Sequence, residues 1–444
     1  MKKIAFYLLC LLMAMQVTSC SKNKAEAGTS AQEENQASQD DFAGTVSVDE
    51  AAQELLESTI KAEEQNNDFS FRLWAMIDQE GENAFFSPYS INTALAMVYN
   101  GSKGNTATEL ARVMGYDFAP ETAHPTLTKM QEKLNQAEEA EVSVANAIFT
   151  AEENQDRLLP DYLELLKKEY LAQHQSLNFA QAQETANFIN KWVAEKTRNR
   201  IKDMVDAGQV KGSNNGLFLA NAIYFKATWL NQFDKYSTRE DVFYTSSARR
   251  KEESKQIDMM QIKAHFPYAK IPGYQLLELP YEDPEFAMLL VLPDEIKGIK
   301  ADLSAKTLIE WQNALSRPRK VKVFIPRFKM EESLDKLVNI FQDMGMKDAF
   351  SGSRADFSGI MKYVPSANLY ISSIAHKAFL EVKEAGTEAA AATVIGMATS
   401  SMPPPEPEMP VFRADKPFLC LILHKPDNTI LFAGKVVNPE AAEE

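Results

Sequence analysis

The sequence contains few cysteines. Of its 444 residues, only Cys10, Cys20 and Cys420 are cysteine, and the first two belong to an N-terminal segment that we expect to be processed. No intrachain disulfide is therefore expected, and stability must come from packing. Cys420 lies within a run of apolar residues, so we expect a buried apolar side chain there and not a nucleophile.

Histidines and catalytic motifs are equally scarce. The five histidines show no metal-ligand spacing, and the sequence lacks HExxH, CxxC, P-loop and GxSxG patterns. We therefore expect no metal site, no cofactor and no enzymatic activity. The histidines are His124, His174, His265, His376 and His424.

Positive charge is also in short supply. The chain has 47 Lys and Arg against 62 Asp and Glu, a formal charge of −15. Such an acidic chain is expected not to bind nucleic acid. The apolar fraction of 45% is ordinary for a globular protein and is sufficient for a large core.

Only the N-terminus carries a long apolar run. Lys2 and Lys3 precede an apolar segment, and residues 1–19 are predicted to be a secretory signal. The residues Val17 to Cys20 resemble a bacterial lipobox, which implies cleavage before Cys20 and lipid on that residue. Ser21 follows the cysteine, and by resemblance to bacterial lipoproteins this favours an outer-membrane anchor. The periplasmic side and the cell surface both stay open.

Residues 20–48 are predicted to be a disordered tether because they contain almost no large apolar residue. From residue 49 to about 440, helical and strand patterns mix without regular alternation, which predicts one α+β domain. Ser90 is predicted to cap a helix over 91–99, and 187–205 has helical spacing. Leu217 to Trp229 is apolar throughout and predicts a strand buried on both faces. Further strands are expected at 142–149, 276–281, 286–292, 320–328, 369–382, 418–424 and 429–437, and further helices at 158–170 and 334–344.

The stretch from Glu381 to Phe418 has conflicting local preferences. Four alanines favour helix, β-branched residues from Thr393 on favour extended chain, and Pro403 to Pro405 forbid helix. One interpretation is a flexible surface linker. The other is an exposed loop that later becomes a strand, because its small side chains would slip between existing strands.

Residues Gly386 to Thr393, with the sequence GTEAAAAT, resemble the hinge of an inhibitory serpin. The segment Phe412 to Phe418 resembles the signature that follows the reactive loop in that family, and Asn83 to Thr106 resembles another. The resemblance covers about 49–439. It implies a single serpin domain of class α+β, with three β-sheets, about eight or nine helices and an exposed reactive loop at about 384–410.

The same resemblance implies roles for individual residues. It places the reactive bond at Ser400–Ser401, with Thr399, Met402 and Met397 as alternatives. It places Trp229 and Arg327 beside Glu384, as a pair that holds the upper end of the sheet shut or as an ordinary surface salt bridge. Buried Asn221 needs partners, and the resemblance suggests Ser87, Ser90 and His376 at the place where the sheet parts. The implied hinge consists of Glu384, Gly386, Thr387, Glu388, Ala389, Ala390, Ala391, Ala392 and Thr393.

The implied function is inhibition of a serine or, as a second choice, a cysteine endopeptidase by insertion of the cleaved loop into the main sheet. The fifteen residues from Gly386 to Ser400 span about 50 Å when extended. No Lys or Arg lies between Gly386 and Pro410, which favours elastase-, subtilisin- or papain-like targets over trypsin-like ones. We expect a monomer. The alternative is a non-inhibitory serpin-fold surface or binding protein.

Overall fold

The computed structural model describes residues 64–121, 125–137, 139–213, 216–295, 303–315, 317–364, 368–387 and 409–442. The chain divides into two compact units, Met1–Ala52 and Gln53–Glu444. All of the first unit lies outside the described residues, so the account below concerns the second. Among the described residues, no helix is both long and apolar enough to span a bilayer.

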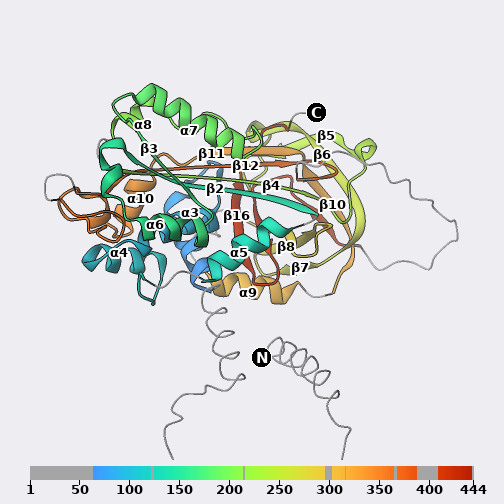
Figure 1. Cartoon of the computed structure of the whole chain (residues 1–444). Helices are drawn as coiled ribbons and strands as arrows, with labels where there is room; N and C mark the ends of the chain where they lie inside the picture. Colours follow the sequence, from blue (N-terminus) through green and yellow to red (C-terminus); the bar gives the residue numbers. More distant parts are fainter. Residues whose placement is uncertain are drawn as a thin grey trace, which may run out of the picture. The chain divides into compact units, whose positions relative to one another are not determined.

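The main sheet has six strands in the order β11-β12-β13-β4-β2-β3 (Figure 1). Strands β4 and β12 pair in parallel, whereas β4 and β2 are antiparallel. The strands of this sheet are β2 (Ala140–Ala151), β3 (Gln173–Leu177), β4 (Leu217–Thr228), β11 (Phe328–Ser333), β12 (Ile371–Val382) and β13 (Gly386–Thr387).

Two further sheets complete the β-structure. One has the order β1-β16-β15-β9-β8-β7 and the other the order β14-β10-β6-β5. The first contains β1 (Ala84–Phe86), β7 (Tyr268–Ile271), β8 (Tyr274–Pro280), β9 (Phe286–Pro293), β15 (Phe418–His424) and β16 (Thr429–Val436). The second contains β5 (Arg239–Tyr244), β6 (Ser254–Phe266), β10 (Arg319–Pro326) and β14 (Val411–Arg413).

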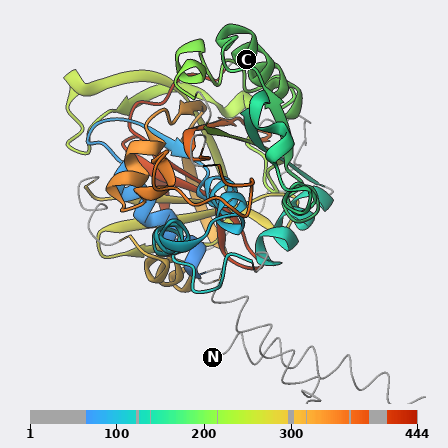
Figure 2. The same cartoon turned by 60° about the vertical axis from the view of Figure 1, so that its left-hand side comes forward.

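Helix α7 lies along one face of the main sheet with the short helix α8 beside it, and the other helices lie on the opposite side of the sheet and around its ends (Figures 1 and 2). Residues 64–77 are also helical. The α-helices are α3 (Pro88–Asn100), α4 (Gly104–Met114), α5 (Pro125–Gln136), α6 (Pro160–Glu169), α7 (Ala182–Lys196), α8 (Ala207–Lys211), α9 (Ala305–Ala314) and α10 (Leu337–Asp343). Short 3-10 helices span Glu152–Arg157, Lys235–Ser237, Lys251–Glu253 and Asp348–Phe350.

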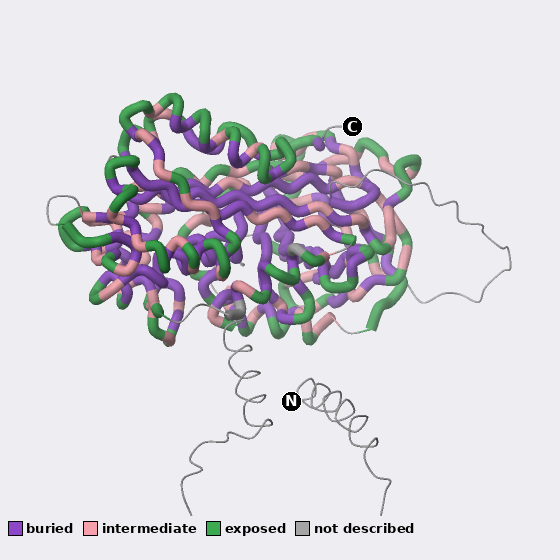
Figure 3. The backbone as a smooth tube through the Cα atoms, in the orientation of Figure 1, coloured by how far each residue is buried: buried purple, intermediate pink, exposed green. Residues whose placement is uncertain are grey.

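Strand β4 is buried on both faces, as its unbroken apolar sequence predicts (Figure 3). Its residues alternate between two cores. Leu219 and Ile223 belong to the larger core, whereas Phe218 packs in the smaller core with Val193 of α7. The main sheet is therefore enclosed between α7 and the body of the domain.

Three sheets with helices around them confirm the predicted α+β class. The hairpins β8–β9 and β15–β16 fall where the sequence predicts them, and Cys420 is buried, which raises the pKa of its thiol to about 12. Strands β5, β6 and β11 were not predicted from the sequence. Polar residues interrupt the alternation of apolar and polar side chains by which a strand is identified.

Two predicted helix boundaries are wrong. Helix α3 starts at Pro88 with Ser87 as its N-cap, not at Ser90, because proline at the first helical position favours the start there. Helix α7 ends at Lys196 instead of continuing to 205. Arg198 and Asn199 have φ values of +49° and +61°, and this left-handed turn stops the helix.

Candidate functional site at the seam of the main sheet

The boundary between β4 and β12 runs through the middle of the main sheet, and we call it the seam. The two strands pair directly from Ile371 and Leu217 up to Phe379 and Tyr224. Beyond that point β13 lies between them and pairs antiparallel with both, with Thr387 opposite Val382 on one side and Ala227 on the other. At its upper end the seam already holds a third strand.

The beginning of the predicted reactive loop is therefore buried. We expected the loop to be exposed from Glu384 on, but Glu384, Ala385 and Thr387 are at most 7% exposed. Glycine at 386 makes this possible, because a Cβ there would lie 2.2 Å from the carbonyl oxygen of Ala227. The absence of a side chain lets the backbone lie directly against β4.

Thr387 is anchored in the core by its hydroxyl. Its side chain is fully buried, and its Oγ1 lies 2.8 Å from the hydroxyl of Tyr281. Burial raises the pKa of Tyr281 far above its usual range, so that phenol stays neutral and available as a hydrogen-bond partner. Neither the Tyr281 contact nor its importance was predicted from the sequence.

Glu384, the first residue of the implied hinge, lies in a polar cluster with Thr238 and Arg327. Thr238 donates to its Oε1 at 2.8 Å, and Nη1 of Arg327 is 3.8 Å from the same oxygen. Arg327 and Glu384 have side-chain exposures of only 12% and 9%, so a surface salt bridge, one of our two alternatives, is excluded. Arg327 also pairs with Asp258, and it therefore divides its charge between two carboxylates.

Trp229 holds the turn that leads from β12 to β13. Its indole Nε1 donates to the carbonyl of Lys383 at 3.0 Å, and its backbone N–H donates to the carbonyl of Ala385 at 2.9 Å. The ring stacks on Tyr281 with centroids 4.4 Å apart and planes within 12°. The structure thus brings Trp229, Arg327 and the start of the hinge together.

The four polar residues predicted around the sheet opening meet at the middle of the seam. Asn221 of β4 is directly opposite His376 of β12, and Nδ1 of His376 lies 2.6 Å from Oδ1 of Asn221. The Nδ2 of Asn221 donates to the carbonyl of Ser90 at 3.0 Å. The backbone N–H of Ser87 donates to Nε2 of His376 at 3.1 Å. This network ties both strands to the start of α3.

The bond from Ser87 fixes the protonation of His376. Because Nε2 accepts a hydrogen bond from a backbone N–H, it carries no proton, and Nδ1 is the donor to Asn221. Burial lowers the pKa of His376 to about 3. The imidazole is therefore neutral at ordinary pH, and its protonation would break the Ser87 bond.

Sequence reasoning missed a fifth member of this network. Asn146 of β2 is directly opposite Asn221, and its Oδ1 accepts a hydrogen bond from Nδ2 of Asn221. The tetrapeptide ANAI occurs twice, at 145–148 and at 220–223, and the structure aligns the two copies side by side. That repeat is a sequence signal from which Asn146 could have been predicted.

Several predicted site residues lie outside the described residues. They are the hinge residues Glu388, Ala389, Ala390, Ala391, Ala392 and Thr393, the reactive-bond candidates Met397, Thr399, Ser400, Ser401 and Met402, and Cys20. In the part of the chain that is described, no three His, Cys, Asp or Glu side chains gather in a way that would hold a metal ion.

Comparison with known proteins identifies the class of this fold and site. The model of one protein family, described as "Serpin (serine protease inhibitor)", matches residues 64–439. The chain belongs to the serpin family, and it is a member of a class of inhibitors and not an enzyme.

Individual relatives cover nearly the whole matched length. Human Serpin B8 is 38% identical over 85% of this chain and 99% of its own length. Leukocyte elastase inhibitor of Xenopus laevis is 37% identical over 84% of this chain and 97% of its own. The structure of uncleaved ovalbumin superposes with a TM-score of 0.74 at 31% identity, covering 85% of this chain and 99% of that one.

Proposed function

We propose that this serpin inhibits an endopeptidase by a suicide mechanism in which its cleaved loop inserts along the seam. The protease nucleophile, a serine hydroxyl or a cysteine thiol, attacks the carbonyl carbon of Ser400. The Ser400–Ser401 peptide bond breaks, Ser401 leaves as a free amine, and an ester or thioester joins Ser400 to the protease. Insertion then carries the bound protease away before water completes the hydrolysis.

The position of β13 carries this proposal. Gly386 and Thr387 already occupy the place of a middle strand, antiparallel to both neighbours. A strand that continued from Thr387 in the same direction would run down the seam, in place of the direct β4–β12 pairs. The site is thus shaped for extension of a strand that has already started.

The hinge sequence suits such an extension. Thr387 faces the core, so with a period of two Ala389 and Ala391 would face it as well. Both side chains are small enough to fit between β4 and β12 without a buried charge. These features favour the inhibitor over a non-inhibitory binding protein of the same fold.

The proposed target is an elastase-, subtilisin- or papain-like endopeptidase. The loop offers small or unbranched residues near Ser400 and no cationic side chain, which a trypsin-like specificity pocket requires. A relative is named leukocyte elastase inhibitor, which agrees with a target of this kind.

The N-terminal sequence supports an exported, lipid-anchored form. We propose that Cys20 carries the lipid and that the tether of residues 20–48 holds a monomeric domain at the bacterial outer membrane, on its periplasmic side or at the cell surface. Metabolic labelling with a fatty acid tests this, and label retained by Cys20→Ala would contradict it.

One experiment tests the inhibitory mechanism. The protein is incubated with elastase, subtilisin and a papain-like protease, and the products are separated on a denaturing gel. We expect a covalent band that survives boiling, and mass spectrometry of the released C-terminal peptide identifies the cut bond.

Two variants sharpen this test. Thr387→Arg and Ala389→Arg would bury a charge, at a cost of several kcal/mol, and are expected to leave the protein a cleaved substrate with no covalent band. Glu388→Arg is the matched control, since residue 388 would face the other side of an extended strand and its side chain already carries a charge. A covalent band of normal intensity with Thr387→Arg would contradict insertion along the seam.

A further inference from the structure

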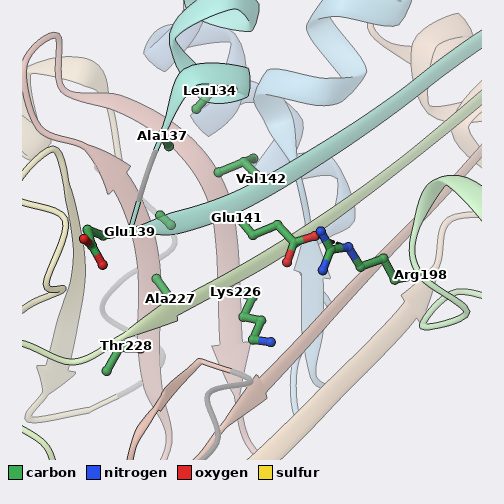
Figure 4. Close-up of a pocket in the computed structure, with 10 residues that line it drawn as sticks. Leu134, Ala137, Glu139, Glu141, Val142, Arg198, Lys226, Ala227 and Thr228 are labelled. Atoms are coloured by element: carbon green, nitrogen blue, oxygen red, sulfur yellow. Dashed lines mark ion pairs between the residues drawn. The ribbon is translucent and has the colours of Figure 1, made fainter.

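A cavity of about 400 Å³ lies beside the seam, between the end of α5, the start of β2 and the end of β4 (Figure 4). Ala227 and Thr228, which line it, are the residues that pair with Thr387 and Gly386. The cavity is thus separated from the inserted hinge only by strand β4.

Four charged residues line this cavity, two carboxylates (Glu139 and Glu141) and two cations (Arg198 and Lys226), and they are not evenly distributed around it. Arg198 forms an ion pair with Glu141 through its Nε, and Glu139 lies on the far side of the cavity from Arg198 (Figure 4). Lys226 is directly opposite Glu141 in the β2–β4 register, yet its ammonium has no hydrogen bond or ion pair with any described residue. The side of the cavity at Glu141 therefore holds two cations and one carboxylate, and only Arg198 is paired with it.

The guanidinium of Arg198 is placed here by the backbone. Its φ of +49° turns the chain at the end of α7 so that the side chain reaches back over β2. Positive φ at a non-glycine residue costs on the order of 1 kcal/mol or more. The ion pair with Glu141 uses Nε, which leaves the two terminal nitrogens, in the fork geometry that binds oxyanions, without a partner among the described residues.

We propose that this cavity is a binding site for a small oxyanion, a carboxylate or a phosphate monoester, held between Arg198 and Lys226. The chain as a whole carries a charge of −15, so its net charge does not attract an anion. The attraction must come from Arg198 and Lys226. The volume is in the range of small-ligand sites. The proposal goes beyond the proposed inhibitory function and does not depend on it.

Isothermal titration of the uncleaved full chain tests the proposal without any protease. Inorganic phosphate and succinate serve as probes at constant ionic strength, with chloride as the reference anion. We expect saturable binding with a Kd below about 1 mM for at least one probe. The probe that binds with the lower Kd shows whether the site prefers phosphate or carboxylate. A matching saturable rise in the melting temperature is expected, because the ligand binds the folded form.

Three variants test whether Arg198 and Lys226 are responsible for anion binding. Lys226→Met and Arg198→Met are each expected to weaken binding at least tenfold. Lys306→Met is the matched control, because Lys306 is 85% exposed on α9 and does not line the cavity, and it is expected to bind normally. No saturable binding of either probe, or equal binding by Lys226→Met, would overturn the proposal.

Discussion

Replacing Gly386 with alanine tests whether the hinge really lies in the sheet. The new Cβ would lie 2.2 Å from the carbonyl oxygen of Ala227 and 2.7 Å from the Cα of Thr228. Both neighbours are backbone atoms of a strand buried on both faces, so they have little freedom to move. We expect β13 to leave the seam instead.

The cost of Gly386→Ala follows from the bonds that β13 loses when it leaves. Trp229 donates to Ala385 at 2.9 Å through its backbone and to Lys383 at 3.0 Å through its indole, and the hydroxyls of Thr387 and Tyr281 lie 2.8 Å apart. At about 1 kcal/mol for each bond, the inserted hinge loses about 3 kcal/mol. The ratio of inserted to withdrawn hinge should therefore fall by about 100-fold.

Hydrogen exchange measures this ratio directly. We expect the amides of Thr387 and Trp229 to exchange about 100-fold faster in Gly386→Ala, while amides in the β15–β16 hairpin keep their protection. Gly212→Ala is the control, since a Cβ there meets nothing closer than 3.6 Å. If Gly386→Ala preserved the protection of Thr387, our description of how the hinge packs against β4 would be wrong.

Three other perturbations address the same region. Tyr281→Phe leaves the buried hydroxyl of Thr387 without its partner, and it should destabilise the inserted hinge by about 1–2 kcal/mol, read as roughly tenfold faster exchange at Thr387. Asn146→Ala removes an acceptor from the buried Asn221 amide, and it should lower the free energy of unfolding by about 1–3 kcal/mol, measured by urea titration; an unchanged midpoint would mean that Asn221 is satisfied without it. For His376 the folded pKa of about 3 lies below the unfolded value of about 6.5, so its contribution is complete above pH 6.5 and is lost as the pH falls from 6.5 toward 3. His376→Gln should therefore reduce the slope of the free energy of unfolding against pH in this range, by up to about 1.4 kcal/mol for each pH unit. His174, whose pKa is lowered to about 4, should account for the slope that is left in the variant. An identical slope in the variant would refute the assignment.

Sequence reasoning succeeded where a pattern has one structural meaning. The unbroken apolar run in β4 predicts a strand buried on both faces, and the polar Asn221 within it demands buried partners. The resemblance to serpins then suggested Ser87, Ser90 and His376, and the structure brings all of them together. A buried amide in an apolar strand limits the possibilities, because an unpaired one is too costly to keep.

It failed where the answer depends on contacts between distant segments. Local composition described residues 384–387 as the start of an exposed loop, since small residues bury little area. Their burial results from contacts with residues far apart in the sequence, since Trp229, Thr238 and Tyr281 each form a hydrogen bond with this segment. Similarly, the left-handed turn at Arg198 that ends α7 has no glycine to mark it.

The seam combines contacts that are easy to separate with one that is not. Ala220 lies opposite Ala375 and Ala222 lies opposite Lys377, so little apolar area is lost when the strands part at these pairs. Between them lies the bond from His376 to Asn221, buried and linked to Ser87, which resists separation far more.

In the loop insertion that we propose, this arrangement would set the order of events. Strand β13 has already displaced the direct β4–β12 pairing at Val382, and His376 lies six residues, or about 20 Å, further down the same strand. Extension from Thr387 would therefore reach His376 after a short run, where it would break the side-chain bond from His376 to Asn221 and replace the backbone pairing of β4 with β12 by pairing to the new strand. Each backbone bond that is broken is offset by one formed to the new strand, whereas the side-chain bond is lost without such replacement, so the polar network is expected to slow insertion at this point. The barrier that keeps the uncleaved protein from inserting its own loop is accordingly expected to depend most on His376 and Asn221, and least on the alanines beside them.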